Sequence, residues 1–406
     1  MGGDGRPLRA LILTNEYPPN VYGGAGVHVE YLTRELAKLI DVDVRTFGSQ
    51  DVADGRLRVR GFPVAHDLSA APEALRPVLG AFSRDLSFAA AGVDADVVHC
   101  HTWYTHLGGI VAKLAYGIPL VITIHSLEPL RPWKREQLGG GYDVSSWVER
   151  TAIEMADAVI AVSQETRADV LRLFDVAEER VTVIHNGIDT DEYQPQKATD
   201  ALDRFGIDRS VPYVLFVGRI TRQKGIVHLV RAIRHLDPRV GVVLCAGAPD
   251  TTEIAAEMET GVAEARAAHP NVVWIPEMVD KPTVRQLYSH AAVFCCPSVY
   301  EPFGIINLEA MACETAVVAS AIGGIPEVVV DGETGVLVPF EAAGDGSFEP
   351  HDPDRYERDL AAAMNALMAD PPRREAMGRA GRQRAVEHFG WDAIARRTVG
   401  LYRSLA

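Results

Sequence analysis

LRALILTNEYPPNVYGGAGVHVEYLTREL, residues 8–36, runs from an apolar segment through a glycine-rich loop into an amphipathic segment. The first seven residues are almost continuously hydrophobic, which is typical of a strand buried on both faces of a parallel sheet. After the loop, apolar residues recur at helical spacing: Val29, Leu32, Leu36 and Leu39. We therefore predict a helix that begins soon after Gly26 and, with the strand before it, the first unit of a doubly wound α/β domain.

The same alternation continues along the chain and then restarts. Further apolar runs in the first half are predicted strands: VDVRTF (42–47), ADVVHC (95–100), PLVITIH (119–125), DAVIAVS (157–163) and VTVIH (181–185). A second series of strands begins with PYVLFVG: 212–218, 240–247, 271–276, 292–298, 315–320 and 335–339. Helical patterning separates most of these runs, and two successive β-α series predict two doubly wound, Rossmann-like domains.

The boundary between the two series is predicted in a polar, turn-rich stretch, residues 186–206. We expect an N-terminal domain over residues 1–190 and a C-terminal domain over residues 191–390. The chain ends in helical patterning, and we expect this last helix, about 391–406, to pack back on the N-terminal domain. Ligands of such sheets bind beyond the carboxyl ends of the strands, so residues that directly follow strands should converge between the two domains.

The bulk composition excludes several classes of protein. The chain of 406 residues has a formal net charge of −15 and lacks a basic cluster long enough to follow a nucleic-acid backbone. Its start lacks the layout of a signal peptide, and it has no run of about 18 apolar residues. The five cysteines lie in apolar stretches without metal-ligand spacing. We therefore expect a cytoplasmic protein that binds neither nucleic acid nor membrane; the sequence does not indicate its oligomeric state.

Two loops that follow predicted strands have the composition of anion-binding loops. Gly23 and Gly24 can bring backbone amides close to a ligand at a helix N-terminus, although glycine turns between strand and helix also occur without a ligand. In VGRITRQKG (217–225), Arg219 and Lys224 lie five residues apart. Two cations at a strand end suit a diphosphate leaving group, and they are equally compatible with a solvated basic loop.

A third segment, SVYEPFGIINLEAMAC (298–313), passes from a strand into an apolar helix. Residues 303–305 fall at the helix start, where free amides suit hydroxyl or phosphate oxygens. Glu301 and Glu309 flank this turn at E-x7-E spacing. We expect Glu309 to lie along the helix and Glu301 at the ligand, so that the two do not work as one acid/base pair.

The segments GRITRQKG, YEPFGIINLEAMAC and GGIPEVVVDGETGVLVP (323–339) resemble the retaining GT-B glycosyltransferases of the glycogen/starch synthase type. The resemblance covers essentially the whole chain. EYPPNVYGGAGVHVEYL, HCHTWYTHLGG (99–109) and TIHSLEPLRPWKREQLGGGY (123–142) look most like the actinobacterial glycogen synthase branch. Members of that branch use ADP-glucose, and several join it to glucose 1-phosphate to give α-maltose 1-phosphate. The resemblance implies an α/β GT-B fold, in which two Rossmann-like domains face each other across a cleft.

The resemblance also implies roles for individual residues. Arg219 and Lys224 match the pair that grips the nucleotide diphosphate, and Glu301 matches the glutamate beside the reacting sugar. His125 matches the histidine that hydrogen-bonds the donor sugar near its C6 hydroxyl. The other donor-binding positions match the family's glycine loop, sugar-binding turn and ribose-binding glutamate: Gly23, Gly24, Phe303, Gly304, Ile305 and Glu309.

Two departures from the family pattern concern the acceptor. The lysine of the family's K-x-G-G loop is Val21 here, and Thr102 replaces the aspartate of its H-D-W-H segment. Both weaken the transfer of long-glucan binding to this chain, so the acceptor stays open between glucose 1-phosphate and the end of an α-glucan. In the basic loop 130–137 we hypothesise that Lys134 or Arg135 receives the phosphate of glucose 1-phosphate; an ordinary exposed loop explains the segment equally well.

For the reaction, the resemblance suggests front-face transfer with retention, in which the departing diphosphate helps to deprotonate the acceptor. Cations and backbone amides would then supply most of the catalysis electrostatically. D-x-D triplets, which hold a metal-diphosphate in other glycosyltransferases, occur at 41–43, 94–96, 189–191 and 352–354. Because a basic pair is available for the diphosphate, we expect no metal and no other cofactor. The alternatives are a GT-B transferase with another small or lipid acceptor and a GT-B module that binds without catalysis.

Overall fold

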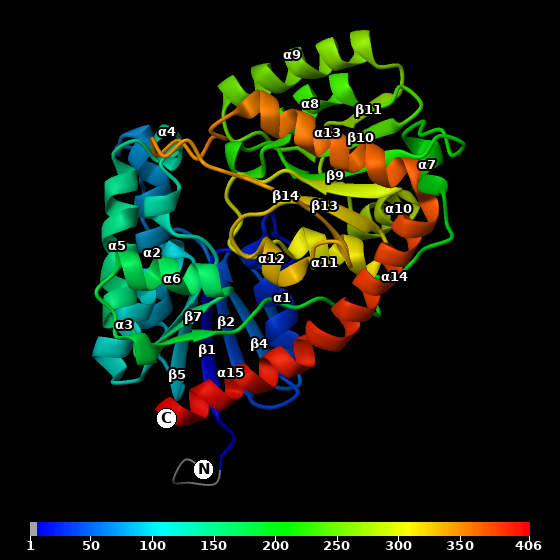
Figure 1. Ribbon diagram of the computed structural model, residues 1–406. Helices are drawn as coiled ribbons and strands as arrows, with labels where there is room; N and C mark the ends of the chain where they lie inside the picture. The colour runs from blue at the N-terminus through cyan, green and yellow to red at the C-terminus, as the bar shows by residue number, and fades with distance from the viewer. Residues whose placement is uncertain (1–5) are drawn as a thin grey trace. The chain divides into compact units, whose positions relative to one another are not determined.

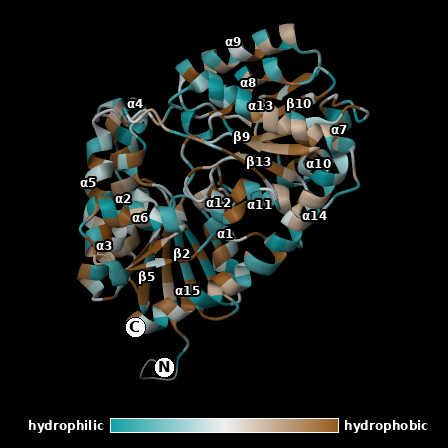
Figure 2. Ribbon diagram, in the orientation of Figure 1, coloured by the Kyte–Doolittle hydropathy of each residue, from teal (hydrophilic) through white to brown (hydrophobic). Residues whose placement is uncertain are grey.

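The computed structural model describes residues 6–406, except for the side chains of residues 136 and 137, and the chain divides into two compact units (Figure 1). The N-terminal unit extends to Gly187 and also includes Trp391–Ala406, and the C-terminal unit is Ile188–Gly390. Each unit is a sheet with helices packed on it. Hydrophobic residues concentrate in the strands, and the helices alternate between hydrophobic and hydrophilic residues (Figure 2). This is the layered α/β architecture predicted from the alternating sequence pattern.

Among the described residues, the sheet of the N-terminal unit has eight strands in the order β3-β4-β2-β1-β5-β6-β7-β8. All neighbours are parallel except β3 and β4, which form an antiparallel hairpin at one edge. The strand bounds are β1 Arg9–Thr14, β2 Asp41–Phe47, β3 Asp51–Asp54, β4 Leu57–Phe62, β5 Val97–His101, β6 Leu120–Ile124, β7 Ala158–Ala161 and β8 Val181–Val183. The strand order reverses between β1 and β5, and ligands of doubly wound sheets bind at the carboxyl ends of the strands at this reversal.

Helices cover both faces of this sheet. Their bounds are α1 Gly24–Leu36, α2 Arg76–Ala90, α3 His106–Tyr116, α4 Lys134–Leu138, α5 Gly141–Met155, α6 Gln164–Leu173 and α15 Trp391–Leu405. One hydrophobic core joins the sheet to α2, α3, α5 and α6, and another joins it to α1 and α15. Among the described helices, none is both long and apolar enough to cross a bilayer.

The final helix, α15, completes the core of the N-terminal unit (red in Figure 1). The ring of Trp391 stacks on Tyr31 of α1 with a centroid distance of 6.0 Å. The hydroxyl of Tyr402 shares a 2.6 Å hydrogen bond with Nδ1 of His99, which is fully buried in β5. The end of the chain therefore supplies both apolar surface and a buried polar contact to its first domain.

Tyr402→Phe is expected to lower the free energy of unfolding by about 1–3 kcal/mol, because Nδ1 of His99 is left buried without a partner. Urea unfolding measures the change in the free energy of unfolding, and hydrogen exchange in the strands of the N-terminal unit locates it. Ser404→Ala is the matched control, since Ser404 is exposed on the same helix. Equal stability of the two variants would contradict a structural role for the buried hydroxyl.

The sheet of the C-terminal unit has six parallel strands in the order β11-β10-β9-β12-β13-β14. Their bounds are β9 Tyr213–Arg219, β10 Gly241–Gly247, β11 Val272–Ile275, β12 Val293–Cys296, β13 Ala316–Ser320 and β14 Gly335–Val338. The helices are α7 Asp200–Arg204, α8 Ile226–Ala232, α9 Thr252–Ala268, α10 Lys281–His290, α11 Ile305–Ala312, α12 Ile325–Val328, α13 Pro353–Ala369 and α14 Pro371–His388. The order reverses between β9 and β12, which predicts a ligand site where these two strands end.

The structure differs from the sequence-based expectation in three local features. Helix α1 begins at Gly24, before Gly26, and ends at Leu36, so Leu39 lies outside it. The hairpin β3–β4 was not predicted; β3 is exposed along its whole length and therefore lacks the apolar run of a buried strand. The predicted linker contains a short helix, α7, and the units divide at its beginning, after Gly187.

Candidate active site

Lys224 and Glu301 meet beyond the carboxyl ends of β9 and β12. Nζ of Lys224 donates a 2.7 Å hydrogen bond to Oε2 of Glu301, and Oγ of Ser298 donates to the same oxygen at 3.1 Å. Glu301 is buried, with 6% of its surface exposed. Burial opposes the charged form of Lys224, but Glu301 and other nearby acids outweigh it and raise the pKa of the amine. The lysine is therefore a fixed positive charge at this edge of the sheet.

The loop that carries Lys224 is built by its neighbours. Oγ1 of Thr221 accepts a hydrogen bond from the amide of Lys224. Gly225 follows in the left-handed conformation, with a φ of +60°, and a Cβ there would lie 2.0 Å from the carbonyl oxygen of Pro297. Only glycine tolerates both constraints, so Gly225 lets the β9 loop approach the end of β12. This contact brings Lys224 within reach of Glu301.

Arg219, the last residue of β9, has a carboxylate partner of its own. Its guanidinium forms a hydrogen-bonded ion pair with Asp250, which follows β10 and is 9% exposed. The two predicted cations therefore lie at the end of β9 and in the loop that follows it, but each is paired with a different acid. A diphosphate that binds here must exchange these partners for its own oxygens.

The turn between β12 and α11 has the geometry of a helix start that presents backbone amides. Gly304 is the N-cap of α11 with a φ of +96°, and Ile305 is the first helical residue. The side chain of Phe303 is buried. The carbonyl of Glu301 accepts a 3.0 Å hydrogen bond from the amide of Gly324, which fixes the backbone of the turn.

Glu309 lies about one turn along α11 and is buried. The hydroxyl of Tyr288 donates a 3.0 Å hydrogen bond to its Oε2. Burial raises the pKa of Glu309 to about 7. The two glutamates of the E-x7-E motif thus have separate surroundings: Glu301 is paired with a cation, whereas Glu309 contacts a phenol.

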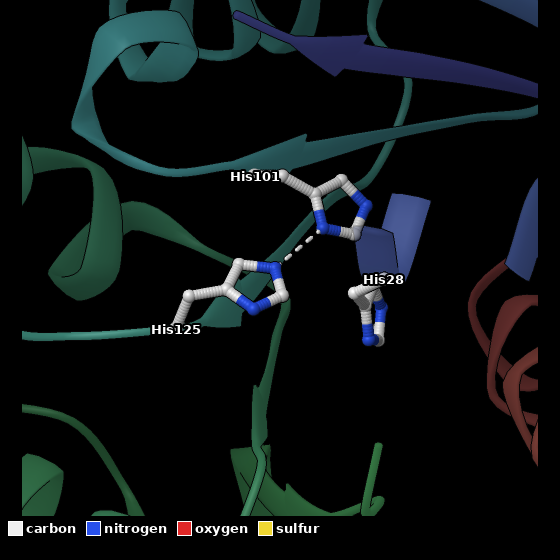
Figure 3. A group of neighbouring side chains, drawn as sticks. All are labelled: His28, His101 and His125. Carbon is white, nitrogen blue, oxygen red and sulfur yellow. Dashed lines mark hydrogen bonds between the residues drawn. The ribbon is translucent and has the colours of Figure 1, made fainter. Parts of the chain in front are cut away.

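In the N-terminal unit, three histidine rings from three elements lie together (Figure 3). His28 belongs to α1, His101 ends β5, and His125 directly follows β6. Nδ1 of His101 and Nε2 of His125 share a hydrogen bond of 3.0 Å, and Nδ1 of His28 lies 2.7 Å from Oδ1 of Asn186. Burial lowers the pKa of all three, that of His28 to about 4, so the rings are neutral at physiological pH.

One nitrogen from each of these three rings lies within 4.8 Å of the others, which is close to the spacing of metal ligands. Two of the rings, however, already share a hydrogen bond with each other. A metal bound through Nε2 of His125 would have to displace the proton that this nitrogen shares with His101. The arrangement fits a hydrogen-bonded cluster.

The glycine loop after β1 differs from the expectation for Gly23. The buried carboxylate of Glu16 accepts hydrogen bonds from the amides of Tyr22 at 2.9 Å and Gly23 at 2.8 Å. The amide of Gly23 is thus used by the protein itself, and Gly24 opens helix α1. A Cβ at Gly26 would lie 2.7 Å from the carboxylate, so this glycine gives room to Glu16. Sequence reasoning missed Glu16, although an acid two residues after a buried strand and before glycines was visible.

The two predicted acceptor residues begin helix α4. Arg135 donates hydrogen bonds of 2.6 and 3.2 Å to Asp143, and both side chains are exposed. Lys134 is half-buried. Arg131, which the sequence analysis did not single out, donates a 2.9 Å hydrogen bond to Ser126, the neighbour of His125. Arg131 is thus tied to the end of β6.

Each of the four D-x-D segments has protein partners. Asp43 accepts hydrogen bonds from Arg45 and Arg60. The others pair with arginines, accept backbone amides or cap a helix: Asp94 with Arg9, Asp96 with Arg6, Asp189 with the amides of residues 191 and 192, and Asp352 with the amide of Arg355. These contacts give the acids structural roles.

Comparison with known proteins identifies the family. Residues 22–192 match the model for Glycosyltransferase Family 4, and residues 198–384 match the model for Glycosyl transferases group 1. The chain is 51% identical over 403 residues to alpha-maltose-1-phosphate synthase of Mycolicibacterium smegmatis, covering 98% of this chain and 100% of the relative. The chain belongs to the GT-B glycosyltransferases.

Further comparisons agree with this assignment. The glycosyltransferase is 49% identical over 402 residues to alpha-maltose-1-phosphate synthase of Mycobacterium tuberculosis, again over 98% of this chain and 100% of the relative. Among solved structures, sucrose-phosphate synthase from Thermosynechococcus elongatus matches with a TM-score of 0.81 and 27% identity, over 98% and 99% of the two chains. The predicted family and its two Rossmann-like domains are confirmed, and the glycosyltransferase is an enzyme, as predicted.

Proposed function

We propose that the glycosyltransferase transfers glucose from ADP-glucose to glucose 1-phosphate, with retention of configuration, and so makes α-maltose 1-phosphate for glycogen biosynthesis. The observation that carries this proposal is the contact of Lys224 with Glu301 where β9 and β12 end. It joins a cation suited to a nucleoside diphosphate to a carboxylate suited to a sugar. The 51% identity to an alpha-maltose-1-phosphate synthase supports the product.

In this proposal the donor exchanges the ion pairs of the free enzyme for its own contacts. The diphosphate takes Lys224 and Arg219, and negative charge that grows on its oxygens during bond cleavage is stabilised by these two cations. Glu301, released from Lys224 but still held by Ser298, turns to the sugar. Amides at the start of α11 bind sugar or phosphate oxygens, Glu309 binds the ribose, and His125 binds the sugar near its C6 hydroxyl.

The transfer itself needs no enzyme nucleophile in the front-face mechanism. The bond between the anomeric carbon and the diphosphate breaks, and the acceptor hydroxyl forms its bond on the same face. The acceptor proton passes to the departing phosphate oxygen. The enzyme contributes position and charge. We expect no metal and no other cofactor, since Lys224 and Arg219 can neutralise the diphosphate and the D-x-D acids have protein partners.

The reaction is proposed to take place in the cytoplasm. All five cysteines are free and buried, as suits a protein that folds in a reducing compartment.

For the acceptor, Lys134→Ala or Arg135→Ala is expected to raise the KM for glucose 1-phosphate by about tenfold with little change in kcat, because each removes a charge-assisted contact to phosphate. Initial rates at saturating ADP-glucose measure it. Arg150→Ala, an exposed arginine of α5 paired with Glu154, is the control. An unchanged KM in both variants would contradict the role of this loop. A raised KM in Arg131→Ala alone would move the phosphate site to the end of β6.

The experiment that tests the function as a whole offers ADP-, UDP- and GDP-glucose with either glucose 1-phosphate or glycogen. Products are identified by mass. We expect a disaccharide phosphate from ADP-glucose and glucose 1-phosphate. Transfer to glycogen alone would replace the small acceptor by an α-glucan end, and transfer to neither would favour another small or lipid acceptor.

A further inference from the structure

His101, the last residue of β5, is fully buried beside His125 (Figure 3). Its Nδ1 shares the 3.0 Å hydrogen bond with Nε2 of His125. Its other nitrogen, Nε2, is buried and has no hydrogen-bond partner in the part of the chain that the structure describes. His101 therefore makes a single side-chain hydrogen bond, and that bond goes to a residue proposed to contact the donor sugar.

The position of His101 is fixed by its surroundings. The ring of His99 lies against it, with a centroid distance of 4.2 Å. His99 is itself held at both nitrogens, by Tyr402 at 2.6 Å and by Thr123 at 2.7 Å. On another side lies His28, whose centroid is 5.3 Å from that of His101. These contacts leave the His101 ring little freedom to turn away from His125.

The hydrogen bond between the two rings needs one proton, and two tautomers can supply it. If Nε2 of His125 carries the proton, neutral His101 must carry its own proton on Nε2, where a buried N–H finds no acceptor. If Nδ1 of His101 carries the proton, its Nε2 is only an unpaired acceptor. A buried donor without an acceptor is the rarer of these two defects in proteins. The second arrangement is therefore favoured.

His28 does not change this conclusion. Its Nδ1 donates to Oδ1 of Asn186, which leaves a lone pair on its buried Nε2. That lone pair is a possible acceptor for His101, but no hydrogen bond joins the two rings. Burial, together with the neighbouring histidines, also lowers the pKa of His101 and so excludes the doubly protonated ring at neutral pH.

With the proton of the shared bond on His101, neutral His125 must carry its own proton on Nδ1. This nitrogen lies on the side of the ring away from His101, and His125 is only half-buried (Figure 3). We propose that His101 is a positioning residue that fixes His125 in the tautomer with a proton on Nδ1, and thereby directs a hydrogen-bond donor to the 6-hydroxyl oxygen of the donor glucose. The inference rests on the proposed function, because it assigns the sugar atom that His125 meets.

The test combines variants of His101 with a donor that lacks the contacted oxygen. His101→Phe keeps a ring but has no nitrogen, whereas the amide of His101→Asn can place a donor near the former Nδ1. With ADP-glucose, His101→Phe should lose roughly tenfold in kcat/KM, and His101→Asn should recover part of that loss. With ADP-6-deoxyglucose, His101→Phe and the wild-type enzyme should be nearly equal.

His106→Phe is the matched control, because His106 is also buried in this unit but makes no hydrogen bond to His125. Its loss, if any, should be the same with both donors. Equal losses with both donors in His101→Phe would overturn the inference and leave His101 a packing residue. Unchanged activity with ADP-glucose would overturn it as well.

A second readout does not depend on turnover. Nitrogen-15 chemical shifts of labelled histidine distinguish a protonated from an unprotonated ring nitrogen, and His125→Gln identifies the signals of His125. We expect a protonated Nδ1 and an unprotonated Nε2, with a mixture of tautomers in His101→Phe. A protonated Nε2 in the wild-type enzyme would overturn the inference. Failure of the proposed function would instead show as a wild-type enzyme inactive with ADP-glucose.

Discussion

Lys224→Ala is expected to lower kcat with ADP-glucose by about 10²–10³-fold, the usual loss when one preorganised group that stabilises transition-state charge is removed. Lys224 is partly buried in an ion pair with Glu301, which raises the pKa of its amine, so its charge is already present before the substrate arrives. Once the diphosphate has replaced Glu301 as its partner, Lys224 needs no further reorganisation when charge develops on the diphosphate. Steady-state rates of ADP release in the presence of acceptor measure the loss.

Arg222→Ala is the matched control for Lys224→Ala. Arg222 lies two residues away in the same loop, is 40% exposed, and approaches Glu257 only to 3.8 Å. It should retain nearly full activity. A similar loss in both variants would mean that the loop, and not the charge of Lys224, supports turnover.

Glu301→Gln separates the two halves of the Lys224–Glu301 ion pair. Without the carboxylate, Lys224 no longer has to leave a partner when a diphosphate binds. Calorimetry with ADP alone should therefore show tighter binding than in the wild-type enzyme, while turnover of ADP-glucose falls. Weaker binding of ADP would contradict the exchange of ion pairs on which the proposed mechanism depends.

Acidification from pH 7.5 to pH 5 is expected to remove the stability that three buried histidines contribute to the N-terminal unit. In the same unit Asp85 and Glu149, whose pKa values burial raises, contribute with the opposite sign, so the histidine contribution is measured as a difference between variants. Burial lowers the pKa of His28 to about 4 and of His99 and His106 to about 3. An unfolded histidine takes up its proton near pH 6.5, so below that pH the unfolded chain binds more protons than the folded one. The contribution of these neutral histidines to stability is complete above about pH 6.5. It is lost as the pH falls toward their pKa values in the folded state. At pH 5 each of these three histidines lowers the free energy of unfolding by about 2 kcal/mol.

Thermal unfolding of the wild-type protein and of His106→Leu at the two pH values measures the contribution of one histidine as a difference, and hydrogen exchange, corrected for the intrinsic effect of pH, locates it. His106→Leu removes one buried titrating group, so its loss between pH 7.5 and 5 should be smaller than that of the wild-type protein. Equal losses would contradict the assignment to buried histidines.

The C-terminal unit supplies an internal comparison for the same experiment. Burial disfavours the charged form of His228, but its hydrogen bonds to Glu349 and Glu357 outweigh burial and raise its pKa. Its contribution to stability is present below about pH 6.5 and is lost as the pH rises through the folded pKa, which is the opposite sign. Helix α8, which carries His228, should therefore stay protected at pH 5.

Most of the fold could be predicted because parallel strands buried on both faces leave continuous apolar runs, of which residues 8–14 are an example. The β3–β4 hairpin left no such run. Its outer strand is exposed throughout, and Arg58 and Arg60 interrupt the inner strand, so its pairing with β2 became visible only in three dimensions. An apolar run appears only where the side chains of a strand are buried, and at that edge of the sheet most of them are not.

For the candidate site, the sequence predicted which strand ends carry the residues, but it did not predict which residues contact one another. Residues that follow β9 and β12 had to lie at one edge, so the proximity of Lys224 and Glu301 follows from topology. The ion-pair partners do not follow from topology, because the acid that pairs with Arg219 comes from a different loop, after β10. The histidine cluster was missed for the same reason, because its members stand on α1, β5 and the end of β6 and share no sequence spacing.

The position of α15 has a consequence for how the polypeptide matures in the cell. His99 and its partner Tyr402 are 303 residues apart in sequence. At ribosomal speeds of about 5–20 residues per second, roughly 15–60 seconds separate the synthesis of the two. During that time the nascent first domain lacks one of the two helices, α1 and α15, that pack on one face of its sheet. The domain made first is thus completed last, and until then the exposed face is available to chaperones and to misassembly.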